Sequence, residues 1–186
     1  MTRVQSLFIR VQLILGFVIV LTSARGQEQL FAAARANDVK ALTSLLDAQA
    51  EAINQIDQRG NTALIIACYN DSFDAAKLLL QHGADPNMQD KMGNTALMGA
   101  CFKKLDRIVS LLLDHKVQVN QQNFNGATAL IFAATFGAND ALATLMKHDA
   151  DPSIRDNFGK NALDYATNQA NDAAIALLQK ERKAVQ

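Results

Sequence analysis

The sequence predicts an all-α solenoid of about five stacked helix-turn-helix repeats, with β-turn or hairpin tips and two degenerate repeats as caps. The first observation is an opening, D-x-x-G-x-T-A-L, that starts at Asp57 and Asp90, recurs with Asn at Asn123 and returns in weaker form at Asp156. The second is the even spacing of these openings, a period of about 33 residues that is typical of solenoids. The third is that each opening precedes two apolar segments, which no single repeat can bury alone.

Residues 1–26 differ in composition from the rest of the chain. Two arginines make a basic start, residues 13–21 form an apolar run, and the small residues Ala24 and Gly26 end the segment. This order is typical of a secretory signal peptide that is cleaved after Ala24 or after Gly26. A membrane anchor and a buried helix are the alternatives, but a spanning helix needs about 20 apolar residues, about twice the length of this run. We therefore expect residues 1–26 to be a signal peptide and the repeat domain to span residues 27–186.

The charge balance argues against a nucleic-acid partner. The whole chain carries 18 Lys and Arg against 18 Asp and Glu. A leader of residues 1–26 contains Arg3, Arg10 and Arg25 and no acid, so its removal leaves 15 basic against 18 acidic residues, a net charge of −3. A nucleic-acid binder shows a concentrated basic face instead. The remaining length is ample for one domain with a continuous core.

The first repeat, residues 27–56, is degenerate. Residues 30–38 predict its first helix and residues 39–46 its second, followed by a link one residue longer than in the other repeats. Its outward positions are polar, as a terminal repeat with one wet side requires. The last repeat, residues 156–186, has a similar polar surface around the apolar pair at residues 177–178.

The three central repeats, residues 57–89, 90–122 and 123–155, share one plan. Asp or Asn and Gly stand in the tip, where a tight turn needs a side-chain acceptor and a residue free to take positive φ. A Thr then begins the first helix, where its hydroxyl can cap backbone N–H groups. Small residues keep the first helix thin, and large apolar residues fill the second. The capping residues are Thr62, Thr95 and Thr128, the small pairs begin at Ala67, Ala100 and Ala133, and the large residues include Leu78, Leu79, Leu80, Ile108, Val109, Leu111, Leu112, Leu113, Leu142, Leu145 and Met146.

A resemblance to a known family rests on two segments of the second repeat. They read Gly60-x-Thr62-x-Leu64-x-x-Ala67 and Leu78-Leu79-Leu80-x-x-Gly83-Ala84-Asp85-Pro86-Asn87. This pattern resembles the ankyrin repeat, and the resemblance implies an ankyrin-repeat solenoid over residues 27–183. The chain has Ala63 and Ile65 where the family usually has Pro and His, so it lacks the Pro that presets the first helical turn. The T-A-L variant resembles bacterial members more than animal ones.

Three histidines, His82, His115 and His148, recur with the repeat period at the end of the second helix. Such a ladder would suit a metal or haem carrier. Equivalent positions in packed helices, however, lie about 8–10 Å apart, whereas each ligand of one Zn²⁺ lies about 2 Å from the metal. An imidazole at a helix end can instead meet the last carbonyl groups and the negative end of the helix dipole. We therefore expect capping histidines, with no metal site and no cofactor.

Cys68 and Cys101 occupy equivalent positions in neighbouring repeats. Two cysteines in an exported chain invite a disulfide, but a bridge needs Cα atoms no more than about 7 Å apart. Both cysteines replace a small Ala of the thin first helix. We therefore expect free, buried thiols that act as small hydrophobes.

The sequence contains no recognisable catalytic pattern. It has no Gly-rich phosphate loop, no HExxH, no CxxC and no nucleophile elbow. The recurring aspartates, such as Asp57, Asp85 and Asp90, stand at turns, where a structural role suffices. We therefore expect a protein that is not an enzyme.

The resemblance also implies a binding surface. In ankyrin-repeat proteins the tips and the ends of the first helices line a concave groove, and aromatic, Met and Arg residues are enriched at interface hot spots. The variable positions of this surface carry no acid here, which implies a protein partner with carboxylates around an apolar centre. The candidate partner-binding residues are Arg59, Tyr69, Lys91, Met92, Phe102, Lys103, Phe124, Phe136, Phe158 and Lys160.

Our first functional hypothesis is a monomeric interaction module, exported to the bacterial periplasm, that binds another protein through its concave face. The exported bacterial ankyrin-repeat proteins that it resembles protect, regulate or inhibit periplasmic enzymes, such as a catalase or a cell-wall hydrolase. That resemblance implies a periplasmic enzyme as partner and no membrane contact after cleavage. The alternatives are a haem or metal carrier that uses the histidines, and a secreted effector that acts on host proteins.

Overall fold

The structure is a computed structural model that describes residues 26–184, with side chains to residue 180. The predicted signal peptide therefore lies outside the described residues, apart from Gly26. Residues 26–35 are helical. The elements that follow are α2 (Val39–Ala48), the 3-10 helix η1 (Ala50–Asn54), α3 (Ala63–Tyr69), α4 (Phe73–Gln81), α5 (Ala96–Lys103), α6 (Asp106–Leu113), α7 (Ala129–Phe136), α8 (Asn139–Lys147), α9 (Ala162–Asn168) and α10 (Asp172–Ala184).

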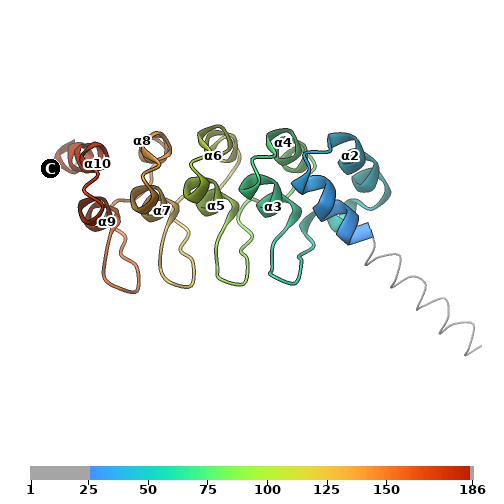
Figure 1. Ribbon diagram of the computed structural model, residues 1–186, viewed down its shortest axis with the longest axis horizontal. Helices are drawn as coiled ribbons and strands as arrows, with labels where there is room; N and C mark the ends of the chain where they lie inside the picture. The colour runs from blue at the N-terminus through green and yellow to red at the C-terminus, as the bar shows by residue number, and fades with distance from the viewer. Residues whose placement is uncertain (1–25, 185–186) are drawn as a thin grey trace, which may run out of the picture.

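The helices form two rows along one elongated array (Figure 1). The helices α3, α5, α7 and α9 lie in one row and pack against their neighbours in that order. The helices α4, α6, α8 and α10 form the second row, and α2 packs against α4. The tips project from the first row on the side away from the second (Figure 1). This arrangement confirms the predicted all-α solenoid of stacked helix pairs.

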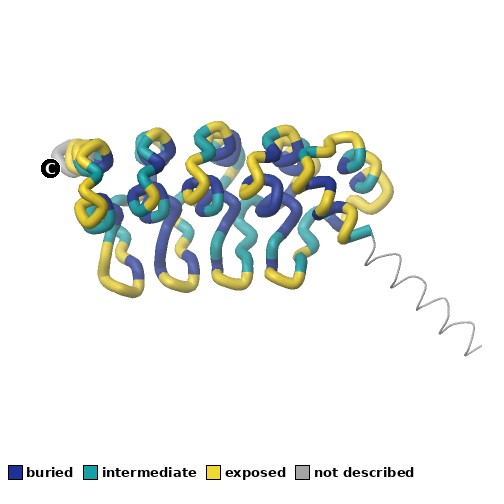
Figure 2. Tube along the Cα trace, viewed as in Figure 1, coloured by how far each residue is buried: buried dark blue, intermediate teal, exposed yellow. Residues whose placement is uncertain are grey.

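The core runs between the two rows, where buried residues lie on the facing sides of the helices (Figure 2). Cys68 and Cys101 of the first helices are 0% exposed, and so are Leu79, Leu112 and Leu145 of the second helices. The small residues keep α3, α5 and α7 thin, so neighbouring repeats approach closely enough to bury the leucines between them. The predicted division into a thin first helix and a large apolar second helix is confirmed.

The three threonines cap the first helices as predicted. Thr62 Oγ1 accepts a hydrogen bond from the N–H of Ile65 at 3.2 Å. Thr95 and Thr128 each accept one at 3.3 Å from the N–H three residues later. In the last repeat Asn161 takes this role and accepts from the third residue of α9 at 3.0 Å. Each cap satisfies an N–H group that the helix itself leaves without a partner.

Each tip is closed by one carboxylate or amide oxygen. Asp57 Oδ1 accepts hydrogen bonds from the N–H groups two and four residues later, at 2.7 and 2.8 Å. Asp90, Asn123 and Asp156 repeat this arrangement. Among residues 26–184 the one isolated β-bridge joins Ile56 to Thr62, so the tips are turns rather than paired strands.

Backbone hydrogen bonds join each tip to the next. The N–H of Lys91 donates to Arg59 O at 3.0 Å, and the corresponding bond from Phe124 to Met92 O is 3.2 Å long. A third bond runs from the N–H of Asn157 to Asn125 O at 2.9 Å. The tips therefore form a continuous ladder, and each tip holds its neighbour in register.

Asparagines at the repeat period form a second ladder between the loops. Asn54 Oδ1 accepts from the N–H of Asp85 at 2.9 Å, and Asn87 Oδ1 accepts from the N–H of Gln118 at 2.6 Å. Asn120 continues the series by accepting from the N–H of Asp151 at 2.8 Å. These contacts satisfy loop backbone groups and tie each repeat to the next. Sequence analysis placed Asn87 in the family pattern without assigning it this role.

The first repeat differs from expectation in its link. Helix α2 continues to Ala48, beyond the predicted end at Leu46, and the link then folds as η1. Ala52 of η1 is 5% exposed, so the extra residue is accommodated by a short helix that buries an apolar side chain. Gln27 Nε2 donates to Ile56 O at 2.8 Å, which joins the beginning of the described chain to the end of the first repeat. Within residues 26–184, no helix has both the length and the apolar character required to cross a membrane.

Candidate functional site

A cleft of about 820 Å³ lies along the tips and first helices, from Arg35 to Phe132. Its floor and walls come from successive repeats, which the tip ladder holds in register. The structure brings five of the ten predicted partner-binding residues into this cleft. They are Arg59, Tyr69, Lys91, Met92 and Phe102.

Four aromatic rings form a cluster along the first helices. Tyr69 and Phe102 stack with their ring centroids 6.0 Å apart and an angle of 10° between the rings. Phe102 meets Phe136 edge to face at 4.6 Å, and Phe136 lies 6.0 Å from Phe132. Tyr69 is 44% exposed, Phe102 36% and Phe136 39%. Each of these three rings therefore packs against its neighbours and still offers a face or an edge to a ligand.

The cations beside the cleft form no ion pair within the described residues. The one ion pair among the described residues joins Arg155 to Asp164, at the far end of the array. Arg59 and Lys91 are exposed and line the cleft. Lys103 Nζ lies 5.1 Å from the centroid of the Tyr69 ring, within the range of a cation–π contact. These side chains are free to meet an acidic ligand.

One acid also lines the cleft, Asp90, which stands at the repeated first position of the tip and not at one of the variable positions. Its Oδ1 accepts hydrogen bonds from the N–H groups of Met92 and Asn94, both at 2.8 Å. Its Oδ2 accepts from Asn94 Nδ2 at 3.2 Å. The carboxylate is thus engaged in closing the tip, which is why the tip pattern requires it there, and the uncommitted charges of the cleft are positive.

Five predicted residues do not line this cleft: Lys103, Phe124, Phe136, Phe158 and Lys160. Phe124 and Phe158 stand on tips and are 66% and 74% exposed. Lys160 Nζ lies 5.6 Å from the centroid of the Tyr165 ring. Phe136 is joined to the cleft through its ring contacts with Phe102 and Phe132. Phe136 and Lys103 therefore adjoin the cleft through their contacts with its rings, whereas Phe124 and Phe158 are separate exposed rings on the tips.

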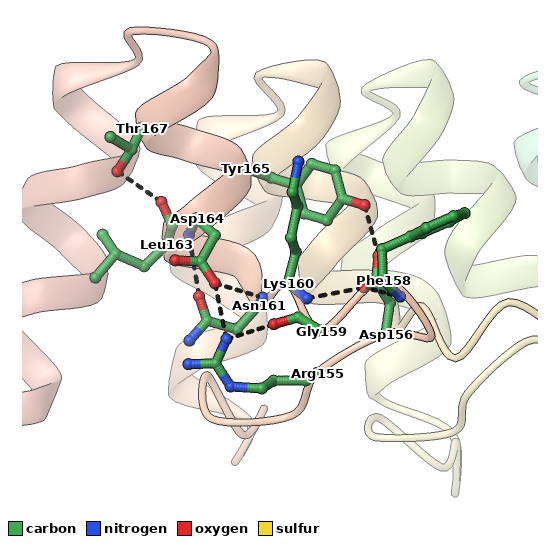
Figure 3. A network of polar contacts seen from close by, with 10 residues as sticks. All are labelled: Arg155, Asp156, Phe158, Gly159, Lys160, Asn161, Leu163, Asp164, Tyr165 and Thr167. Atoms are coloured by element: carbon green, nitrogen blue, oxygen red, sulfur yellow. Dashed lines mark hydrogen bonds and ion pairs between the residues drawn. The ribbon is translucent and has the colours of Figure 1, made fainter.

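The last tip is held by a polar network that sequence analysis did not predict (Figure 3). The Tyr165 hydroxyl donates to Asp156 Oδ2 at 2.5 Å, and this bond raises the pKa of Tyr165 to about 12. Burial acts to raise the pKa of Asp156, but hydrogen bonds from Tyr165 and from the N–H groups of Lys160 and Phe158 outweigh burial and lower it. The network fixes the backbone that carries Phe158, whose ring remains exposed.

Sequence analysis also missed the floor of the cleft. Ile66, Gly99 and Phe132 line it from three successive first helices, at equivalent positions of their repeats. The sequence contained a signal for this floor: when the repeats are aligned, Ile66, Gly99, Phe132 and Tyr165 occupy the same position. A comparison of these four equivalent positions would have shown three large side chains and one glycine.

Two of the three histidines act as predicted. His82 Nδ1 lies 2.9 Å from Leu78 O, and His115 Nδ1 lies 2.8 Å from Leu111 O. Each ring thus meets a carbonyl group at the end of its own helix. For His148 no such hydrogen bond occurs within the described residues, although it is the C-cap of α8. Residues 26–180 contain no group of three or more His, Cys, Asp or Glu side chains arranged to hold a metal.

Cys68 and Cys101 are free and buried, as predicted. Both are 0% exposed. Burial raises the pKa of both thiols, and the nearby charge of Asp106 raises that of Cys101 further. Since the thiolate is the reactive form, these side chains are inert packing residues.

Comparison with known proteins agrees with the repeat fold. A model of ankyrin repeats, three copies long, matches residues 30–123 and again residues 97–186. A sequence comparison with curated proteins gives no match. The two family matches overlap and together cover most of the chain, including every helix from α2 to α10. The chain therefore belongs to the ankyrin-repeat family.

Proposed function

We propose that this protein is exported to the periplasm, where it binds a partner protein through the cleft and protects, regulates or inhibits it, without being an enzyme itself. The observation that carries the proposal is the aromatic cluster of Tyr69 and Phe102 beside cations that form no ion pair in the described residues. Such a surface suits an acidic patch with an apolar centre, because aromatic anchors supply affinity and complementary charges supply steering.

The family and the fold support a binding role. Ankyrin repeats are generally protein–protein interaction modules and are typically non-enzymatic. The two ladders hold the cleft residues on a preformed surface, so binding does not have to order flexible loops. By resemblance to exported bacterial members, we propose a periplasmic enzyme as the partner, bound by one copy of this chain.

Export is the first expected outcome. When the full chain is produced in a Gram-negative bacterium, the periplasmic fraction should contain a mature protein that begins at Arg25 or Gln27, because Ala24 and Gly26 fit a signal peptidase site. Intact mass and N-terminal sequencing measure this directly. A Val18→Arg variant interrupts the apolar run and should remain uncleaved. Full-length chain with Met1 in the membrane fraction would contradict export.

The second expected outcome concerns binding. Mature protein on a resin should retain a partner from periplasmic extract, and purified partner then allows kinetic measurement. Lys103→Glu should slow association by about tenfold at low ionic strength and weaken its salt dependence, because steering depends on charge near the contact. Lys77→Glu makes the same charge change at an exposed position of α4 in the second row.

The paired variants decide whether the cleft side is the binding surface. If Lys77→Glu slows association as much as Lys103→Glu, only net charge matters and the cleft assignment is wrong. If neither variant changes the rate and Phe102→Ala leaves the affinity unchanged, the partner binds elsewhere on the array.

A further inference from the structure

One column of the repeat alignment gives the cleft an uneven floor. The column contains Ile66, Gly99, Phe132 and Tyr165, which recur at the repeat period on α3, α5, α7 and α9. The first three line the cleft. Three positions carry large side chains, whereas α5 presents only its backbone.

The fold does not require glycine at position 99. Gly99 lies within α5 (Ala96–Lys103), and it is not among the residues with positive φ. An added Cβ would meet only Tyr69 Cδ2, at 3.6 Å, which is an ordinary van der Waals distance. Glycine inside a helix is less favourable than alanine because it loses more conformational freedom on folding. The chain therefore carries a less stable residue where a methyl group would fit.

The missing side chain leaves a notch in the cleft floor. Ile66 and Phe132 stand on the neighbouring helices at the equivalent position, and Tyr69 and Phe102 line the same cleft. The Tyr69 and Phe102 rings are stacked on one another, so they form a fixed apolar wall. The apolar lining of this open notch is in contact with water, and a side chain of suitable size would remove that surface from water and contact the lining.

We propose that this notch receives one large apolar side chain of the partner, aromatic or aliphatic, from a segment that also carries a carboxylate. The proposal rests on the binding function proposed above and names the chemistry that the cleft selects. Arg59 and Lys91 line the same cleft and have no ion-pair partner among the described residues, so a carboxylate beside the anchor meets opposite charge. An apolar side chain placed against the Tyr69 and Phe102 rings has the setting of an interface hot spot.

The test uses a displayed library of random peptides selected on the mature protein. Enriched peptides should share an aromatic or large aliphatic residue next to Asp or Glu. The same peptides, synthesised, are then measured on Gly99→Ala, Gly99→Leu and Ala176→Leu. Ala176 is exposed on α10, so the last variant adds the same side chain away from the cleft.

Side chains introduced at Gly99 should affect stability and peptide binding differently. Gly99→Ala should raise the Tm by about 2–4 °C, because alanine favours the helix and the methyl group has room. Gly99→Leu should remain folded and should weaken peptide binding by about tenfold or more, because its side chain occupies the place of the anchor. Ala176→Leu should leave peptide affinity unchanged.

The outcomes distinguish the notch from the cleft as a whole. If peptides bind Gly99→Leu as tightly as wild type and lose affinity on Phe102→Ala, the cleft binds ligands and the notch proposal is wrong. If neither variant changes their affinity, or if no enriched peptide depends on these positions, both proposals fail. If Gly99→Leu does not fold, a several-fold weaker affinity for the folded Gly99→Ala variant supports the notch, and an unchanged affinity overturns it.

Discussion

Replacing Gly93 by Ala is expected to lower the free energy of unfolding by about 3 kcal/mol or more, because two costs add. Gly93 has φ +80°, a region that costs an L-residue about 1–2 kcal/mol. A Cβ there would also lie 2.6 Å from Phe124 N and 2.7 Å from Phe124 Cδ1. The Phe124 N–H donates to Met92 O, so the clash falls on the bond that joins the two tips.

Gly159→Ala is the matched control for this prediction. Gly159 occupies the same position in the last tip and has φ +73°, but a Cβ there would have no atom within 4 Å. Its replacement should therefore cost only the backbone strain, about 1–2 kcal/mol. Urea unfolding followed by circular dichroism measures both values. Equal losses for the two variants would show that the tip ladder contributes nothing beyond local strain.

Cooperativity offers a second readout of the same change. A repeat array is stabilised by contacts between neighbours, so weakening one contact can uncouple the repeats on either side. The clash at Gly93 lies between the third and fourth repeats. Hydrogen exchange should therefore show faster exchange on both sides of that contact in Gly93→Ala, whereas in Gly159→Ala the change should be confined to the last repeat.

The fold could be predicted from the sequence because the repeat period constrains every helix at once. One strong repeat, such as that starting at Asp90, indicates the expected place of each cap and each core leucine in the others. Where a segment departs from the repeat period, its structure could not be predicted. The first link is one residue longer than its counterparts, and nothing in its sequence indicated that Ala52 would be buried in a 3-10 helix.

The cleft could be predicted only in part, because its shape depends on side chains from different repeats. Phe136 is one residue out of step with Tyr69 and Phe102, yet its ring lies 4.6 Å from that of Phe102. Gly99 is one of several small residues when its own repeat is considered alone. The hollow at Gly99 is recognised only by comparison with the neighbouring repeats, where Ile66 and Phe132 carry large side chains at the equivalent position.

The charge of the cleft could likewise be predicted only in part from the sequence. The sequence shows which acids stand near the tips but not which of them are committed to hydrogen bonds. Asp90 is part of the cleft wall, and three hydrogen bonds to its two oxygens close the tip. Lys91, the next residue, is exposed and without an ion-pair partner among the described residues. Asp90 keeps its negative charge, but Arg35, Arg59 and Lys91 outnumber it along the cleft, so a ligand meets net positive charge there.

Phe102→Ala is expected to weaken partner binding by about 2 kcal/mol, a loss of roughly thirtyfold in affinity. Phe102 lines the cleft, and its ring contacts both Tyr69 and Phe136. Truncation would remove the ring surface that contacts the partner. It would also free the Tyr69 ring, which stacks on the Phe102 ring. Among the ring contacts of the described residues, no other ring links Tyr69 to the rest of the cluster.

The same change will also cost some stability, because the ring is only 36% exposed. Two aromatic pairs are lost, each contributing about 0.5–1.5 kcal/mol beyond area burial. We therefore expect a free energy of unfolding lower by about 1–3 kcal/mol, with the protein still folded at room temperature. Affinity must be measured by calorimetry on protein whose folded fraction has been determined by circular dichroism, so that unfolding is not counted as lost binding.

Phe158→Ala provides the comparison that decides which part of the predicted surface binds. Its ring is 74% exposed on the last tip and lies outside the cleft. If the cleft is the site, this variant should change affinity by less than about 0.5 kcal/mol, as surface substitutions usually do. If Phe158→Ala weakens binding and Phe102→Ala does not, the partner lies along the exposed tips instead. If Phe102→Ala unfolds the protein while its residual folded fraction binds normally, the ring belongs to the packing between repeats, and Tyr69 and Lys103 must be tested on their own.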